Sequence, residues 1–231
     1  LYVVHVSADE AVAEIAAARH KGQPVFGETC PQYLFLSTDN LAEPDFEGAK
    51  YVCSTPPLRP REHQEVLWRG LRNNELQVVS TDHCPFCFSG QKEMGRGDFS
   101  KIPPNGMPGV ENRMDLLHQA VVDGHISRRR WIEIACASPA RMFGLYPKKG
   151  GTIAPGADAD IVVYDPAAEQ TVSAETHHMN VDYSAYEGGK QLTGRVETVL
   201  SRGEVIIDHR TYTGRAGHGS YTPRATCQYL N

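Results

Sequence analysis

The sequence lacks the two features that would point to a membrane or to a nucleic acid. No apolar run reaches the roughly 20 residues that a membrane-spanning helix needs. There is no basic surplus either, because 23 Lys and Arg stand against 28 Asp and Glu and leave a net charge of −5. Without a basic stripe, the chain has little with which to neutralise phosphates. We therefore expect no membrane and no nucleic-acid partner.

Targeting and disulfide signals are also missing. The first residue is Leu1 rather than methionine, and the apolar run Leu1–Val4 is typical of a strand already under way. We therefore expect the true N-terminus to lie upstream. Six cysteines are present, but a chain of 231 residues can bury a core without a disulfide framework. We predict free thiols and a reducing, cytoplasmic location.

Alternating strands and helices fill the first part of the chain. Three short apolar runs predict strands, at residues 1–6, 24–27 and 76–80. Ser7 and Glu10 fit a capping box that opens one helix, and residues 62–73 predict another. Strands that alternate with helices imply a parallel sheet, either doubly wound or closed as a barrel. We therefore predict an α/β fold.

The pattern changes after residue 147. Before it, Ser127 and the pair Ser138-Pro139 predict two more helix N-termini. After it, the helical pattern gives way to short strands, and residues 196–200 and 204–207 predict a hairpin. We place three regions along the chain: an α/β part at 1–147, a β part at 148–213 and a tail at 214–231.

The ends of the predicted strands carry the residues with chemical potential. His5, Glu28 and Asp82 stand where strands end and loops begin, which is where barrel enzymes place their chemistry. A carboxylate after an apolar strand is costly to desolvate unless it is paired or metal-bound. An imidazole and a carboxylate together suit zinc. Because two ligands are too few for a stable zinc centre, the others must come from elsewhere.

Other polar groups carry weaker signals. The CxxC at Cys84–Cys87 has no second ligand pair, and a Gly-rich loop follows it where a redox motif needs a helix start. We interpret His177-His178 as solvent-facing or interface residues and His218 as part of a loop. Asp158 and Asp160 are interpreted as turn residues.

Seven segments occur in a specific order, at residues 1–7 (LYVVHVS), 27–34 (GETCPQYL), 57–59 (PLR), 80–84 (STDHC), 105–111 (NG and GVE), 138–141 (SPAR) and 151–160 (GTIAPGADAD). Together they resemble dihydropyrimidinases and D-hydantoinases of the amidohydrolase superfamily along the whole chain. The last segment alone is shared by many amidohydrolases, so the ordered set carries the resemblance.

This resemblance implies a fold and an activity. The fold would be the C-terminal part of a (β/α)8 TIM-like barrel, strands six to eight, followed by part of a small β-sandwich. The activity would be zinc-dependent hydrolysis of the ring amide of dihydrouracil, dihydrothymine or hydantoins to N-carbamoyl amino acids. Two zinc ions are implied, with the remaining ligands, including a carboxylated lysine, upstream of Leu1. The chain alone is therefore expected to be inactive.

The resemblance also implies roles for four residues. His5 matches a zinc-binding histidine, and Asp82 matches a zinc ligand that also moves the proton. Ser54 and Asn105 match positions whose main chain contacts the substrate. The sequence departs from the family pattern at four doubled residues, at Pro56-Pro57, Pro103-Pro104, Gly150-Gly151 and Gly188-Gly189. The first two fall in substrate loops, so the register of Ser54 against Thr55 stays open, and an added proline lacks a backbone donor.

Three alternatives stay open beside this interpretation. One is a non-catalytic relative such as the collapsin response mediator proteins, although His5 and Asp82 are both retained here. Another is a different cyclic amidase, an allantoinase or a dihydroorotase. The third is a stand-alone β-rich binding module, which would expose unpaired sheet edges. The family resemblance further implies a small cyclic amide as the partner and a homotetramer.

Overall fold

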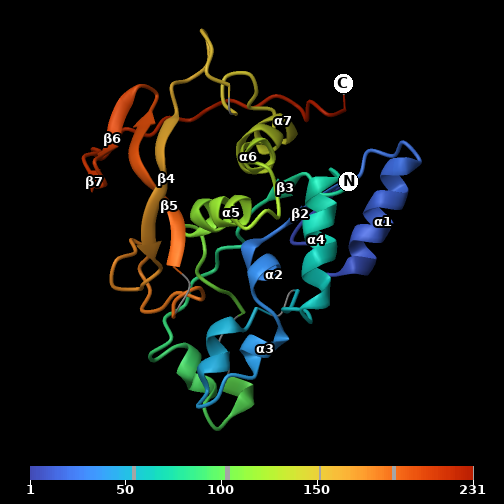
Figure 1. The fold of residues 1–231 in the computed structure, drawn as a ribbon, viewed down its shortest axis with the longest axis vertical. Helices are drawn as coiled ribbons and strands as arrows, with labels where there is room; N and C mark the ends of the chain where they lie inside the picture. Colours follow the sequence, from blue (N-terminus) through green and yellow to red (C-terminus); the bar gives the residue numbers. More distant parts are fainter. Residues whose placement is uncertain (54–55, 102–104, 151, 189–190, 231) are drawn as a thin grey trace. The chain divides into compact units, whose positions relative to one another are not determined.

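The structure is a computed structural model that describes residues 1–53, 56–101, 105–150, 152–188 and 191–230 (Figure 1). Its contacts divide the chain into two compact units. The first unit combines Leu1–Leu117 with Thr171–Gln191, and the second combines His118–Gln170 with Leu192–Asn231. This division by contacts differs from the predicted regions, because residues 118–147 group with the β part. The assignment of 1–147 to a barrel stays a prediction.

A three-stranded parallel sheet lies at the centre of the first unit. Its order is β1 (Tyr2–Val3), β2 (Phe26–Thr29) and β3 (Val78–Val79), so the strand order in space follows the chain. Tyr2 pairs with Phe26, and Glu28 pairs with Val78. The three predicted strands and their parallel arrangement are confirmed. Because all three run the same way, their carboxyl ends share one edge of the sheet.

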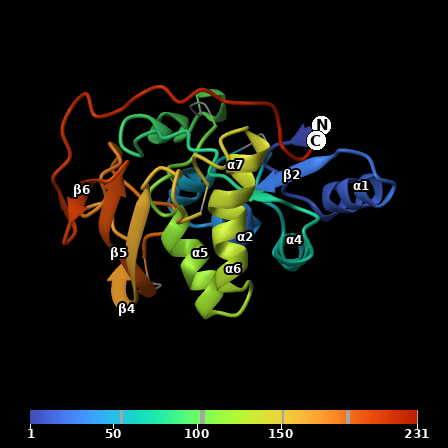
Figure 2. The same cartoon turned by 90° about the horizontal axis from the view of Figure 1, so that it is seen from above.

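Two helices lie side by side on one flank of this sheet, α1 (Asp9–His20) and α4 (Glu62–Arg72) (Figures 1 and 2). Leu67 and Leu71 of α4 are fully buried. A Cβ on Gly27 of β2 would lie 2.9 Å from both Ile15 Cδ1 and Leu76 Cδ2, so these two side chains pack directly against the strand. Apolar side chains on the helices thus fix the sheet from one side, as the pattern at 62–73 predicts.

The predicted capping box at the start of α1 is wrong. The helix begins at Asp9 with Ala8 as N-cap, and no side chain of the cap residue accepts a bond. Ser7 is buried and its Oγ accepts a hydrogen bond from Arg59 Nε at 3.1 Å. His63 of α4 supplies the cap instead, because its Nδ1 accepts from the Asp9 N–H at 3.2 Å. A distant side chain has replaced the local one.

Short helices fill the loops of the first unit: α2 (Pro31–Phe35), α3 (Thr38–Leu41), η1 (Glu47–Tyr51), η2 (Lys92–Gly95) and η3 (Phe99–Lys101). A longer helix, α5 (Arg113–Val122), begins in this unit. The Gly-rich loop expected after Cys84–Cys87 therefore contains two helical turns, η2 and η3. No helix of the described residues is long and apolar enough to cross a membrane.

One continuous helical stretch opens the second unit. It comprises α6 (Arg128–Ile132), a π-helical segment η4 (Glu133–Ala137) and α7 (Ser138–Met142). Ser127 caps it, since its Oγ accepts from the Arg130 N–H at 3.1 Å, which confirms that N-terminus. The predicted start at Ser138 is wrong, because Ala137 has helical dihedrals and the chain runs through.

The four-stranded sheet of the second unit has the order β4 (Ile161–Thr171), β5 (Gln191–Ser201), β6 (Glu204–Asp208) and β7 (Thr211–Tyr212). The predicted hairpin is confirmed, because β5 and β6 are antiparallel and Ser201 pairs with Glu204. Arg202 and Gly203 between them have φ of 49° and 84°. Two consecutive positive φ values define the tight turn whose twist suits a hairpin.

The described part of the tail, residues 214–230, contains no helix or strand and is bonded to the helical stretch of its own unit. The Ala225 N–H donates to the Gly144 carbonyl at 2.9 Å, and the Gln228 N–H donates to the Arg141 carbonyl at 3.0 Å. Tyr229 Oη bonds Ser138 Oγ at 3.2 Å. The end of the tail therefore contacts α7 and the residues that follow it.

Candidate active site

The structure brings His5 and Asp82 to the same edge of the parallel sheet. His5 follows the carboxyl end of β1, and Asp82 follows that of β3. These strands flank β2, and neighbouring strands lie about 4.8 Å apart, so the two outer strands are separated by about 10 Å. Side chains that lean toward β2 from both sides can therefore approach one another at this end of the sheet.

Both residues have a backbone conformation that non-glycine residues rarely adopt. The φ angle is 41° at His5 and 48° at Asp82. Such conformations cost about 1–3 kcal/mol, persist where the surrounding structure enforces them, and cluster at functional sites. The matching strain after two strands of one sheet therefore marks this edge as a candidate site.

The donor atoms of both side chains fit a metal ion. In the part of the chain that the structure describes, neither the His5 imidazole nor the Asp82 carboxylate makes a hydrogen bond or ion pair. His5 is half-buried and Asp82 is exposed. One nitrogen and one carboxylate donor without protein partners are ligands of the type that zinc accepts. Two such ligands form part of a metal site and leave the rest to other residues.

Glu28, the third residue at this edge, has a different role. Its Oε2 accepts from Tyr2 Oη at 2.5 Å, and its Oε1 accepts from Ser80 Oγ at 2.7 Å. Burial, followed by the Glu28 carboxylate, raises the pKa of Tyr2 far above its usual value, so the phenol remains a donor. Because both oxygens of Glu28 are engaged, the carboxylate joins β1 to β3 and is not a free ligand.

Buried groups below this edge were not identified from the sequence. Cys30 Sγ lies 3.2 Å from Ser80 Oγ, and Tyr33 Oη donates to the Pro56 carbonyl at 2.9 Å. Burial raises the pKa of the Cys30 thiol and of the Tyr33 phenol, and the charge of Asp82 adds to both effects. Both groups are thus neutral near pH 7. Both residues lie in the family motif at 27–34, but neither was selected from the sequence as a site residue.

The loop after Asp82 is fastened by His83. Its Nδ1 accepts from the Gly109 N–H at 3.1 Å and lies 3.3 Å from the Val110 nitrogen. Burial lowers the pKa of His83, which favours the neutral imidazole that can accept these bonds. Cys84 in the adjoining CxxC is exposed and unpaired with another cysteine. All six cysteines are free, as predicted.

The two predicted main-chain contacts have different outcomes. Ser54 lies outside the described residues, as do Thr55, Pro103, Pro104, Gly151 and Gly189 among the doubled positions and their neighbours. Asn105 is described and exposed, and its neighbour Gly106 is buried. The Gly106 N–H donates to the Val52 carbonyl at 3.2 Å. The segment that carries Asn105 therefore lies beside the segment that leads to Ser54.

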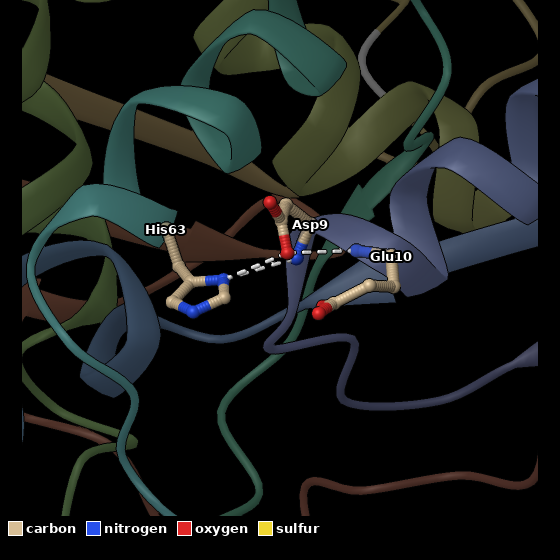
Figure 3. A group of neighbouring side chains, drawn as sticks. All are labelled: Asp9, Glu10 and His63. Atoms are coloured by element: carbon tan, nitrogen blue, oxygen red, sulfur yellow. Dashed lines mark hydrogen bonds and ion pairs between the residues drawn. The ribbon is translucent and has the colours of Figure 1, made fainter.

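A second group of potential metal ligands lies elsewhere, at the first turns of α1 and α4: Asp9, Glu10 and His63 (Figure 3). His63 Nδ1 accepts from the Asp9 N–H and lies 3.1 Å from Asp9 Oδ1. Asp9 Oδ1 also accepts from the Glu10 N–H at 2.9 Å. These bonds engage His63 Nδ1 and Asp9 Oδ1 at the start of α1, so the contact between His63 and Asp9 caps that helix.

The remaining polar residues make structural contacts. His178 Nδ1 lies 2.8 Å from Glu111 Oε1, and His177 Nε2 lies 2.9 Å from the Val181 carbonyl. His178 is exposed, as predicted, but neither histidine lies in a strand. Asp158 and Asp160 both pair with Lys149, so they fasten their turn.

Comparison with known proteins defines the class of the chain. The amidohydrolase family model matches residues 4–206. The chain therefore belongs to the amidohydrolase family, as the ordered motifs predict.

Within that family, the chain is similar to D-hydantoinases and dihydropyrimidinases. It is 85% identical over 230 residues to a D-hydantoinase of Streptomyces coelicolor, covering 100% of this chain and 48% of that protein. A solved dihydropyrimidinase from Brevibacillus agri NCHU1002 superposes with a TM-score of 0.93 at 54% identity, covering 98% of this chain and 48% of that one. A solved D-hydantoinase from Bacillus sp. AR9 gives 0.93 at 53% identity, with coverage of 98% and 49%. The predicted resemblance is confirmed, and the chain spans about half the length of the curated relatives it matches.

Proposed function

We propose that this chain supplies part of the active site of a metal-dependent hydrolase that opens cyclic amides. The observation that carries the proposal is the pairing of His5 with Asp82 at one sheet edge. Both follow outer strands of the same parallel sheet, both have positive φ, and both lack protein partners among the described residues. The similarity to D-hydantoinases and dihydropyrimidinases supports this proposal.

His5 and Asp82 would hold metal, for which we propose two zinc ions. The His5 imidazole offers a nitrogen donor and Asp82 a carboxylate donor, which is a common zinc ligand combination. The remaining ligands, including a carboxylated lysine, would come from residues outside this chain. Bound metal would polarise the amide carbonyl and lower the pKa of water toward about 7.

The exposure of Asp82 supports a role in proton transfer. Its carboxylate is accessible and has no competing donor in the described structure. It would accept the proton of the attacking water and donate it to the ring nitrogen as the C–N bond breaks. The products are open-chain N-carbamoyl amino acids. One residue thus acts first as the general base and then as the general acid.

The substrates that we propose are dihydrouracil, dihydrothymine and hydantoins. Main-chain groups near Ser54 and Asn105 would hold the amide edges of the ring and fix the angle of attack. The bond from the Gly106 N–H to the Val52 carbonyl supports this, because it joins the segments that lead to the two positions. Strands β1 to β3 would be barrel strands six to eight, and the protein would be a cytoplasmic homotetramer.

The experiment replaces each ligand beside a matched control, in the protein expressed from its complete gene. We expect Asp82→Ala to lower kcat on dihydrouracil and hydantoin a hundredfold or more, since a positioned acid or base typically contributes that much. His5→Asn should lower the zinc content measured by elemental analysis. The controls are Asp45→Ala and His209→Asn, because Asp45 and His209 also have positive φ, at 57° and 43°.

Retention of more than about a tenth of the wild-type activity in Asp82→Ala would count against the proton-transfer role. Zinc content unchanged in both His5→Asn and Asp82→Ala would remove the metal site. Equal losses in the controls would show that the positive φ conformation, and not the ligand, is what the protein needs. Sedimentation of the same samples measures the oligomeric state.

A further inference from the structure

A lysine is buried in the loop that follows the candidate site. Lys92 opens η2 and its side chain is 1% exposed, although lysine is almost never fully buried without a partner. Among the described residues no carboxylate pairs with it. Its Nζ instead donates to two main-chain carbonyls, Val52 at 3.0 Å and Gly106 at 2.7 Å. The ammonium therefore bridges two backbone segments that are far apart in the sequence.

The two bridged segments are those that lead to the proposed substrate contacts. Val52 stands two residues before Ser54, and Gly106 directly follows Asn105. The Gly106 N–H donates to the same Val52 carbonyl, so that oxygen accepts from both sides. Packing there is tight, because a Cβ on Gly106 would lie 2.2 Å from the Cys84 carbonyl oxygen. A small displacement of one segment would thus displace the other.

The charge of Lys92 is costly in this position. Burial lowers the pKa of Lys92 to about 8. The bonds from Nζ to two carbonyls favour the protonated form. An apolar side chain of similar volume often stabilises a core as well as a buried charge does. Stability alone therefore does not account for a lysine here. The requirement that one nitrogen hold two carbonyls in a fixed arrangement does account for it.

We propose that Lys92 is a positioning residue that joins the segments 51–53 and 105–107 and so sets the spacing of the main-chain groups that meet the substrate. This inference rests on the proposed function for the identity of the substrate. The link that Lys92 makes between the two segments does not depend on the proposed function. Lys92 contacts no substrate in this proposal and acts through the two carbonyls. Its loss should weaken substrate binding more than it slows the chemical step.

The test compares Lys92→Met with Lys101→Met in the protein expressed from its complete gene. Lys101 lies in the same loop, but its side chain is 65% exposed and pairs with Asp98 on the surface. For Lys92→Met we expect the amide of Gly106 to exchange with deuterium at least tenfold faster. We also expect KM for dihydrouracil to rise about tenfold, with kcat within about threefold of wild type, which is the signature of lost uniform binding.

Zinc content should stay near wild type in both variants. The melting temperature should fall in Lys92→Met and not in Lys101→Met, because only Lys92→Met removes the donor to two buried carbonyls. Lys92→Gln keeps N–H donors without the charge and covers the case in which the methionine variant does not fold. It should give an intermediate KM and intermediate exchange at Gly106, since neutral donors form weaker bonds than charged ones.

An unchanged rate of amide hydrogen exchange at Gly106 in both Lys92→Met and Lys92→Gln would show that Lys92 does not hold the two segments together. Faster exchange with an unchanged KM would overturn the positioning role. A fall in kcat with KM unchanged would also contradict it, because that pattern places Lys92 in the chemical step. If the wild-type protein hydrolyses no cyclic amide, the proposed function is wrong and so is the substrate part of this inference. Hydrogen exchange at the Gly106 amide would still test whether Lys92 holds the two segments together.

Discussion

The interior of the first unit and the surface of strands β5 to β7 in the second unit use polar side chains differently. In the first unit, polar groups are buried and bonded to backbone far along the chain, as Gln77 Oε1 accepts from the Gly27 N–H at 3.0 Å and Lys92 donates to two carbonyls. In the second unit, charged side chains pair at the surface of the sheet, as Arg210 does with Glu197 and Arg215 with Glu204. The two kinds of contact differ in what their loss costs.

This difference indicates where the molecule tolerates change. A buried polar group that loses its partner costs about 1–3 kcal/mol, whereas an exposed ion pair contributes about 0–1 kcal/mol. The first unit should therefore be sensitive at its polar contacts and at its core. The second should be tolerant along its exposed strands. Paired substitutions, one in each unit, can break or sharpen this contrast.

The largest difference should come from apolar truncation. Leu71→Ala in α4 removes a side chain that is 0% exposed, and we expect it to lower the free energy of unfolding by about 2–5 kcal/mol. Val163→Ala in β4 truncates a residue that is 50% exposed and should cost about 0.5 kcal/mol. Urea unfolding measures both. Equal losses would show that β4 is covered by residues outside this structure.

Replacing a glycine by alanine in each unit should give the next largest difference in stability. Gly106→Ala places a Cβ 2.2 Å from the Cys84 carbonyl oxygen and 2.7 Å from the Cys84 Cβ, so backbone must move. We expect a loss of about 1–3 kcal/mol and weaker substrate binding. Gly203→Ala in the β5–β6 turn meets nothing within 4 Å, but its φ of 84° should cost about 1 kcal/mol. Thermal melting with a KM measurement separates the two, because only Gly106→Ala should raise KM.

The smallest contrast concerns two carboxylates. Glu28→Gln weakens the bonds from the Tyr2 and Ser80 hydroxyls, and we expect it to lower stability by about 1–2 kcal/mol at pH 7. Glu204→Gln should cost less, because Glu204 is exposed beside Arg215 and salt screens the pair.

The pH dependence of stability tests the contribution of Glu204. Hydrogen bonding to Arg215 lowers the pKa of Glu204, so its contribution is present above the usual glutamate pKa and is lost as pH falls through the lowered value. Melting temperatures of wild type and Glu204→Gln should therefore converge on acidification. A gap that widens at low pH would contradict this assignment.

Several features were predictable because their causes are local. Three apolar runs bounded by turn residues predicted the parallel sheet, and the Arg202-Gly203 turn predicted the β5–β6 hairpin. Strand ends followed from the same runs, which is why His5 and Asp82 were selected and why both lie at one sheet edge. The ordered motifs predicted the family that the comparison confirms. The role of His5 and Asp82 as metal ligands stays a proposal.

Other features failed or were missed because their causes lie elsewhere in the chain. Ser7 has the residue type of a cap but bonds Arg59, and His63 caps the helix from 54 positions away. Glu28 was selected by position, yet both its oxygens are taken by neighbouring strands. Ser138 also has a capping residue type, but the helix before it continues through π-helical turns.

The sequence by itself determined the α/β pattern, the strand ends and the family, because periodicity and short motifs are properties of neighbouring residues. Only the tertiary structure decided which polar groups meet. Lys92 reaches Val52 across 40 positions, and nothing near Lys92 in the sequence distinguishes it from a surface lysine. Burial gives that lysine its two carbonyl partners, and burial depends on how the whole unit packs.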